Sequence, residues 1–187
     1  MFVDIEKIIQ VICYFLQKFP QKQLDYTKIL KLVFFADKYH LREYWDMITN
    51  DKYYAMKLWP VASLTYDILK NPEDLDLEWI DLPFEKDNFL IILKKEISDF
   101  DFLSETEKDT LDKIYKTFWN KDWKTLADDT HNYSERAEKY NPERWRVDMD
   151  TIDFFNNSVN QDKIFDESPE NLEITKSLYV EKLNYAI

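Results

Sequence analysis

The sequence predicts an α+β protein that is predominantly helical, a compact helical domain of about six to eight helices with a small antiparallel β-hairpin. Hydrophobic residues make up 45% of the 187 residues and aromatic residues 17%, which suits a packed globule rather than a disordered chain. Apolar residues recur at helical spacing along most of the chain, whereas strict alternation is confined to one stretch. Glycine is absent, which removes glycine-rich phosphate loops and leaves turns to Asn, Asp and Pro.

Two helices are expected in the first quarter of the chain. The first covers residues 3–19, and Pro20 ends it. The second starts behind Asp25 or Thr27, either of which can cap exposed backbone N–H groups, and it ends near Tyr44. Because most of its surface is apolar, we expect this second helix to be covered on two sides. Its only polar strip is narrow and consists of Lys28, Lys31, Lys38 and Arg42.

Asp37 stands out on the second helix. Its neighbours three and four positions away are apolar, namely Val33, Phe34 and Leu41. A carboxylate in such surroundings costs stability unless donors bind it. We therefore expect Asp37 to accept a hydrogen bond from a nearby backbone or side-chain donor.

A short irregular segment follows the second helix. Residues 45–59 are read as a connection with a turn at 50–51, in which residues 53–58 form either a short strand or a tight turn. Pro60 suits the first turn of a helix, so a third helix is expected over residues 60–70.

One stretch has strand character. Leu75, Leu77 and Trp79 alternate with acidic residues, and residues 89–93 are a short apolar run. We interpret the two as a β-hairpin joined by residues 84–88. Helices followed by a hairpin also resemble the order of a winged helix, which raises a DNA-binding alternative. The hairpin is strongly acidic, however, and this favours the topology without DNA contact.

Further helices are expected in the last third of the chain. Ser104 and Glu107 have capping-box spacing at the start of one helix, and Asp122 can cap another that runs to His131. Residues 132–147 are polar and aromatic and are compatible with a short helix. Helical patterns then cover residues 149–155 and 168–185.

Two regions follow from this reading. We expect residues 1–147 to form the main domain and residues 148–187 to form a helical C-terminal extension packed on the same domain.

A set of motif residues runs from the second helix through the third. The helix reads KILKLVFFADKYHL, and the segment after it reads ITNDKYYAMKLWPVASLTYDILK. Together they resemble the Panacea domain, the SocA-like antitoxin family, and the similarity continues more weakly to about Tyr140. The positions that carry the resemblance include Lys28, Asp37, His40, Thr49, Asp51, Pro60, Tyr66 and His131.

Two positions depart from the family pattern. The glycines of that pattern are Asn50 and Trp59 in this chain. Asparagine tolerates the left-handed backbone conformation, so the first change is mild. Trp59 places a large aromatic side chain where the family has none, and we expect it to alter the surface that meets a partner.

Charge is distributed unevenly. The net charge is −12, but residues 1–70 carry 10 basic and 8 acidic side chains, whereas residues 71–187 carry 15 and 29. An acidic chain repels phosphate backbones, which disfavours nucleic acid as a partner. It attracts a basic protein and speeds association with it, although solubility alone also explains the charge.

Residues with catalytic potential are few. Asp37 and His40 lie three positions apart on one helix, and His131 is the only other histidine. These three could in principle bind a metal, but no metal-ligand spacing supports this, and packing or hydrogen bonding explains the histidines better. The lone Cys13 is interpreted as a small buried hydrophobic residue. No motif indicates a reaction, so we expect no enzyme activity, metal or cofactor.

Aromatic residues in polar or irregular stretches are candidate anchors for a partner protein, because Trp and Tyr are typical of interface centres. The alternative is that they belong to an aromatic-rich core. The candidates are Tyr53, Tyr54, Trp59, Tyr133 and Trp145.

The resemblance implies an antitoxin of a toxin–antitoxin system, which neutralises a cognate toxin by direct binding. In this interpretation the second helix and the 50–51 turn form a rigid platform, while Trp59 and the acidic later segment contact a toxin that is itself basic. The family also implies an alternative, a proteolytic adaptor that delivers the toxin to an ATP-dependent protease complex. A phage-associated DNA-binding regulator is a third reading. No signal peptide or membrane span is evident, so we expect a cytoplasmic protein without membrane contact.

Overall fold

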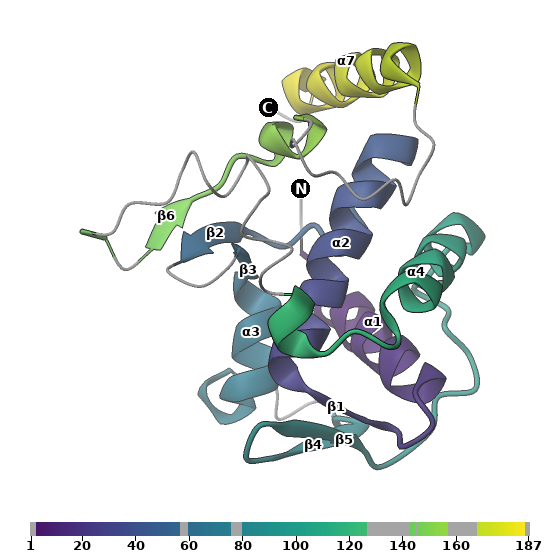
Figure 1. Cartoon of the computed structure of the whole chain (residues 1–187), viewed down its shortest axis with the longest axis vertical. Helices are drawn as coiled ribbons and strands as arrows, with labels where there is room; N and C mark the ends of the chain where they lie inside the picture. Colours follow the sequence, from purple (N-terminus) through teal and green to yellow (C-terminus); the bar gives the residue numbers. More distant parts are fainter. Residues whose placement is uncertain are drawn as a thin grey trace.

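The computed structural model describes residues 3–56, 60–75, 80–126, 143–144, 146–156 and 168–185. Within these ranges the protein is α+β and predominantly helical, as predicted, with two small antiparallel sheets. Figure 1 shows helix α2 running through the middle of the molecule, with α1 and α4 beside it and α7 across its far end. No helix in the described part of the chain is both long enough and apolar enough to cross a membrane.

The first two helices begin at aspartate caps. Helix α1 spans Ile5–Lys18, and Asp4 Oδ1 accepts a hydrogen bond from the Lys7 N–H at 3.1 Å. Helix α2 spans Tyr26–Tyr44, and Asp25 Oδ1 accepts from the Thr27 N–H at 2.7 Å. Asp25 is therefore the cap, one of the two predicted residues. The lone Cys13 is fully buried in α1, as expected.

Helix α2 is buried along nearly its whole length, from Thr27 to Arg42. Helices α1, α4 and α7, strand β3 and a 3-10 helix all pack against it. Helix α2 is therefore covered on more sides than the two that we expected. The predicted polar strip is itself inside the protein, because Lys31 and Lys38 have no exposed surface and Lys28 and Arg42 are 8% and 2% exposed.

Several of these buried cations donate hydrogen bonds to backbone carbonyls. Lys28 Nζ donates to the Trp119 carbonyl at 3.0 Å, just beyond α4, and Lys31 Nζ to the Pro60 carbonyl at 3.4 Å. Arg42 Nη1 donates to the Phe154 carbonyl at 3.0 Å. Each acceptor lies far from its donor in the sequence. The cations therefore tie α2 to three different parts of the chain.

The first sheet contains β1 (Gln23–Asp25), β4 (Phe84–Asp87) and β5 (Leu90–Leu93) in the order β1-β5-β4. The hairpin is shorter than predicted, since β4 lies in the segment that we expected to be the connection. Asn88 takes up the left-handed conformation, with φ at 53°, and allows a two-residue turn directly before β5. Residues 76–79, the centre of the predicted first strand, lie outside the described residues.

The second sheet contains β2 (Tyr53–Met56), β3 (Pro60–Ala62) and β6 (Arg146–Asp148) in the order β3-β2-β6. Of the two alternatives for residues 53–58, residues 53–56 form the strand, and residues 57–58 lie outside the described residues. Pro60 begins β3 rather than a helix, and an edge strand suits proline because the outer side needs no N–H donor. Helix α3 follows only at Ser63–Lys70, with a 3-10 helix, η1, at Pro72–Asp74. Strand β6 lies in the segment for which a short helix was considered. The local sequence does not indicate this strand, because it forms by pairing with β2, which lies far away in the chain.

The order of α1, β1, α2, α3 and the β4–β5 hairpin follows that of a winged helix, with β2 and β3 inserted between α2 and α3.

Helix α4 spans Glu105–Phe118 and has the predicted capping box. Ser104 Oγ accepts from the Glu107 N–H, and Glu107 Oε2 accepts from the Ser104 N–H. Residues 123–126 are helical behind Asp122, which accepts from the Thr125 N–H at 2.8 Å. The remainder of that predicted helix lies outside the described residues.

The C-terminal elements cover the end of α2. The segment predicted as a helix over 149–155 is a 3-10 helix, η2, at Thr151–Phe155, and α7 spans Pro169–Tyr185. Helix α7 contacts both α2 and η2, as the yellow helix in Figure 1 shows. The division at residue 147 stays a prediction. Strand β6 crosses it and pairs with β2 in the main domain.

Candidate functional site

The motif residues gather around two buried aspartates between α2, β2 and α3. Asp37 comes from α2 and has no exposed surface. Its Oδ1 accepts from the Thr49 N–H at 2.9 Å, and its Oδ2 accepts from the Tyr53 hydroxyl at 2.8 Å and from the Thr49 hydroxyl. The prediction that Asp37 binds a nearby donor is confirmed.

Asp51 plays a matching part for α3. Its Oδ1 accepts from the backbone N–H groups of Lys52 at 2.7 Å and Leu64 at 3.0 Å. Its Oδ2 accepts from the Thr65 N–H and hydroxyl, both at 2.7 Å. The residue directly before α3, Ala62, has no side chain that could cap the helix. Asp51 therefore caps α3 from the other end of the β2–β3 hairpin.

The turn between the two aspartates links them. The Asp51 N–H donates to Thr49 Oγ1 at 3.2 Å, and the same hydroxyl donates to Asp37. Asn50 adopts the left-handed conformation, with φ at 52°, which asparagine accepts more readily than most residues. We call Asp37, Thr49, Asp51, Tyr53 and Thr65 the aspartate cluster.

Burial and hydrogen bonding act in opposite directions on the cluster. Burial raises the pKa of Asp37 to about 6, although the bonds from Thr49 and Tyr53 oppose this shift. Burial also raises the pKa of Asp51, against four hydrogen bonds that favour its charged form. The pKa of Tyr53 lies well above its ordinary value, because of burial and the nearby negative charge of Asp37. The carboxylates thus serve as acceptors for the surrounding donors.

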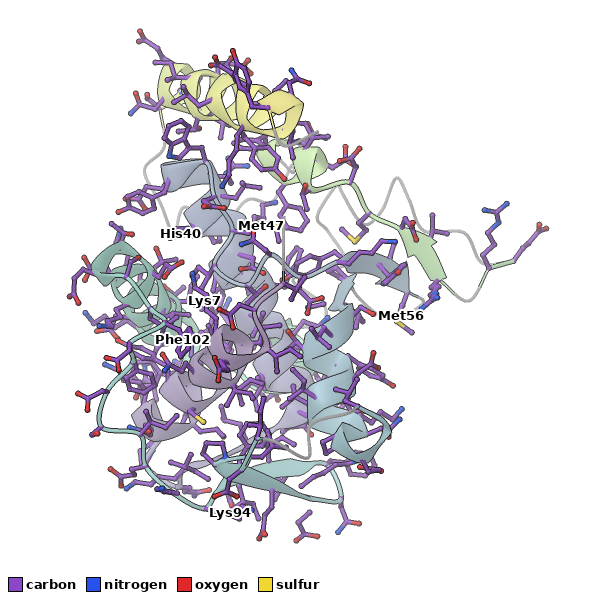
Figure 2. All side chains as sticks on the ribbon, turned by 180° about the vertical axis from the view of Figure 1, so that it is seen from behind. Lys7, His40, Met47, Met56, Lys94 and Phe102 are labelled. Atoms are coloured by element: carbon purple, nitrogen blue, oxygen red, sulfur yellow. The ribbon has the colours of Figure 1, made fainter. Side chains whose placement is uncertain are left out.

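His40 lies near the far end of α2 and is 4% exposed. Its Nδ1 is 2.7 Å from the Asp46 carbonyl and therefore carries the proton, which leaves Nε2 as an acceptor. Burial lowers the pKa of His40, so the ring is neutral. Figure 2 shows His40 close to Met47, in the segment that follows the helix. His40 and Asp37 bind different partners and do not form one site.

The family model for the SocA-like antitoxin, Panacea domain, matches residues 29–135. The match covers more than half of the chain and includes most of α2, the turn, α3 and the hairpin. The chain belongs to this family. Comparison with curated proteins and with solved structures gave no match. The aspartate cluster thus lies within the Panacea domain.

Three other motif residues of the Panacea domain and its edge also make structural contacts. Lys28 lies 4.5 Å from the centre of the Phe19 ring in addition to its bond to the Trp119 carbonyl. Pro60 begins β3 and supplies the carbonyl for Lys31. Tyr66 is half-buried on α3, and its hydroxyl accepts from Lys70.

The aromatic partner candidates divide into three groups. Tyr53 is wholly buried in the Panacea domain, so the expectation that it contacts a partner is wrong for this structure. Tyr54 is half-buried, and its ring lies 5.2 Å from Lys52 Nζ and 4.6 Å from Arg146 Cζ. The remaining candidates lie outside the described residues. They are Trp59, Tyr133, Trp145 and the motif residue His131.

Sequence reasoning missed two members of this region. Thr65 binds Asp51, and no local pattern indicates a partner fourteen positions upstream. Phe154 lies beyond the matched span, yet its ring packs 5.2 Å from Tyr53 and 5.5 Å from Phe34. Among the residues that the structure describes, no group of three His, Cys, Asp or Glu side chains could hold a metal.

Proposed function

We propose that this Panacea protein is an antitoxin that neutralises a cognate toxin by binding it directly, without catalysing a reaction. The observation that carries the proposal is the family match together with the state of the motif residues. Both aspartates of the cluster are buried and hydrogen-bonded through both oxygens. They give the domain a rigid platform, as a binding protein needs.

Enzymatic readings gain little support from the described residues. A general base needs to reach a substrate proton within about 3 Å. Asp37 and Asp51 are at most 3% exposed, and both oxygens of each carboxylate accept hydrogen bonds from protein donors. His40 faces the Asp46 carbonyl inside the protein. These groups act on the fold rather than on a bound molecule.

Charge favours a basic protein as the partner. Four of the 10 basic side chains in residues 1–70, namely Lys28, Lys31, Lys38 and Arg42, are buried in α2. The surface of this half is therefore less basic than its composition suggests. The protein as a whole carries a net charge of −12. Such a surface accelerates association with a basic toxin.

The distribution of charge also disfavours a role as a DNA-binding regulator. In a winged helix the recognition helix would be α3, but its residues are buried or half-buried and include Asp67. The wing would be the β4–β5 hairpin, where Glu85 and Asp87 flank the single Lys86. We expect no retardation of duplex DNA by the purified protein at about 100 mM salt. A shifted band at this salt would favour the regulator.

Co-expression tests the antitoxin function. The neighbouring gene is expressed alone and together with this chain, and growth is measured. We expect the neighbour to stop growth alone and this chain to restore it. A neighbour that is harmless, or whose toxicity is unchanged, contradicts the proposal.

The protein level of the toxin separates direct neutralisation from delivery to a protease. Direct binding predicts that the toxin persists and co-purifies with this chain from the cytoplasm. An adaptor predicts that the toxin disappears and returns when the ATP-dependent protease is deleted. A persistent, bound toxin would support direct neutralisation.

A further inference from the structure

A pocket of about 560 Å³ lies beside the turn that joins the two aspartates. One side is formed by Asn50 and Lys52 of the turn, and the other by Asp148, the last residue of β6, and Asp150, which directly precedes η2. Apolar side chains, including Met47, Met149 and Leu183 of α7, form much of the remaining wall. We call this site the turn pocket.

The turn pocket has two origins in the chain. Its Met47–Tyr53 side lies within the span matched by the family model, whereas residues 148–151 and α7 lie beyond residue 135. Strand pairing holds the two sides together, since the Met149 N–H donates to the Tyr53 carbonyl at 3.0 Å. The turn pocket therefore combines a turn inside the matched domain with a segment outside it.

The turn pocket offers several hydrogen-bond acceptors. The Asn50 Oδ1 atom is buried, and no donor within the described residues reaches it. The carboxylates of Asp148 and Asp150 add two negative charges, which the Lys52 ammonium, 3.3 Å from Asp148, offsets in part. The Thr151 and Tyr179 hydroxyls bind each other at 2.5 Å. A buried acceptor without a donor costs stability, so a ligand that brings donors is favoured.

Resting on the antitoxin function above, we propose that the turn pocket binds an arginine side chain presented by the toxin. A guanidinium carries five N–H donors in one plane and one positive charge, which suits acceptors distributed over Asn50, Asp148 and Asp150. Its aliphatic stem packs on Met47, Met149 and Leu183. The volume also accommodates the residues on either side of the arginine.

Other occupants fit these walls less well. A phosphate would face Asp148 and Asp150. A metal ion would need a group of ligands that the described residues do not provide. An apolar side chain would leave Asn50 Oδ1 without a donor.

Two short peptides test the pocket without the toxin. The probes are acetyl-Ala-Arg-Ala-amide and acetyl-Ala-citrulline-Ala-amide, which have nearly the same shape and differ in charge. They are titrated into the full-length, ¹⁵N-labelled protein while amide resonances are followed. We expect the arginine peptide to shift the resonances of Asn50 and Thr151, with a Kd at least about fivefold lower than that of the citrulline peptide. Equal binding of both peptides, or no binding of either, overturns the proposal.

Three variants locate the effect. Asn50→Gly removes the acceptor and keeps the left-handed backbone, and Asp150→Asn removes a charge while an asparagine can still cap η2. Each should weaken arginine-peptide binding at least about threefold. Glu85→Gln is the matched control, because it removes one negative charge on exposed β4 at the far end of the molecule (Figure 1). An equal loss in the control would overturn the assignment to this pocket.

The neutralisation assay distinguishes the two proposals. If the unaltered protein protects cells and Asn50→Gly and Asp150→Asn protect equally well, the pocket assignment is wrong and the antitoxin function stands. If the unaltered protein does not protect, the antitoxin function is wrong whatever the variants do. Protection that is weakened in both variants but retained in Glu85→Gln supports the pocket. Circular dichroism of each variant confirms that it is folded.

Discussion

Asp37 shows how a single carboxylate can stabilise a helix from inside the core. Its two oxygens accept three hydrogen bonds, from the Thr49 N–H, the Thr49 hydroxyl and the Tyr53 hydroxyl. An ionised carboxylate has about four acceptor sites, whereas an amide at the same position would have one oxygen and two donors. Burial disfavours the charge and the hydrogen bonds favour it, and burial prevails in the pKa of about 6.

The titration of Asp37 predicts how stability depends on pH. The folded pKa of about 6 lies above the ordinary aspartate pKa of 3.8, so the folded protein holds this proton more tightly than the unfolded chain. The contribution to stability is therefore complete below about pH 3.8 and is lost as the pH rises through about 6. Relative to Asp37→Asn, the unaltered protein should lose about 2 kcal/mol of unfolding free energy between about pH 4 and about pH 7.

Urea denaturation of both proteins at several pH values measures this difference. Asp51, whose pKa is also raised, is present in both proteins, and its negative charge contributes to the raised pKa of Asp37. A difference that stays constant from about pH 4 to about pH 7 would show that Asp37 has the same pKa in the folded and unfolded states.

Helix α3 depends on a distant side chain to cap its first turn. It has eight residues and no side-chain cap of its own. Asp51 satisfies the N–H groups of Leu64 and Thr65 in its first turn. A helix this short is marginal in isolation, so its position depends on that bond and on packing. The connection between α2 and α3 is thus made through the turn at residues 49–51.

Removing the Asp51 carboxylate should loosen α3. In Asp51→Ala the bound N–H groups and the Thr65 hydroxyl lose their acceptor in a buried place. We expect a loss of about 2 to 4 kcal/mol in unfolding free energy. The matched control is Asp101→Ala in an exposed turn, which should change it by less than about 0.5 kcal/mol. Similar losses in the two variants would contradict the capping role.

The 3-10 helix η2 provides a second test at this scale. Phe154 has no exposed surface and lies against the rings of Phe34 and Tyr53, both inside the Panacea domain. Phe154→Ala should therefore cost about 3 to 5 kcal/mol by leaving a cavity. Phe102→Ala, at a site that is 42% exposed, should cost less than about 1 kcal/mol. Guanidinium denaturation compares the two, and equal midpoints would show that η2 packs loosely.

In the molecule as a whole, the buried cations of α2 connect this helix to several other segments, including the C-terminal one. Lys28, Lys31 and Arg42 reach carbonyls near α4, in β3 and in η2. Lys7 Nζ joins α1 to α4 through Glu107 Oε1 at 2.5 Å, on the side shown in Figure 2. Four basic side chains are thus buried in α2, in a chain whose acidic residues outnumber its basic ones by 37 to 25. This arrangement suits long-range attraction of a basic partner.

Ionic strength should therefore control the rate at which a basic toxin binds. We expect the association rate constant to fall about tenfold between about 50 mM and about 500 mM NaCl, because salt screens the attraction over distances beyond the Debye length. The dissociation rate should change much less. Stopped-flow or surface-based kinetics measure both constants. An association rate that does not depend on salt would show that the charge of −12 serves solubility alone.

Local features of the sequence determined the helical class, the Asp25 cap, the capping box of α4 and the need of Asp37 for a donor. Each depends on residues within a few positions along the chain, where spacing fixes geometry. Only the tertiary structure decided that the Lys31 and Lys38 strip is buried, since a lysine on a helix has the same local pattern whether its partner is water or a distant carbonyl. The same is true of β6, Thr65 and Phe154, whose places are set by pairing and packing with residues far away in the chain.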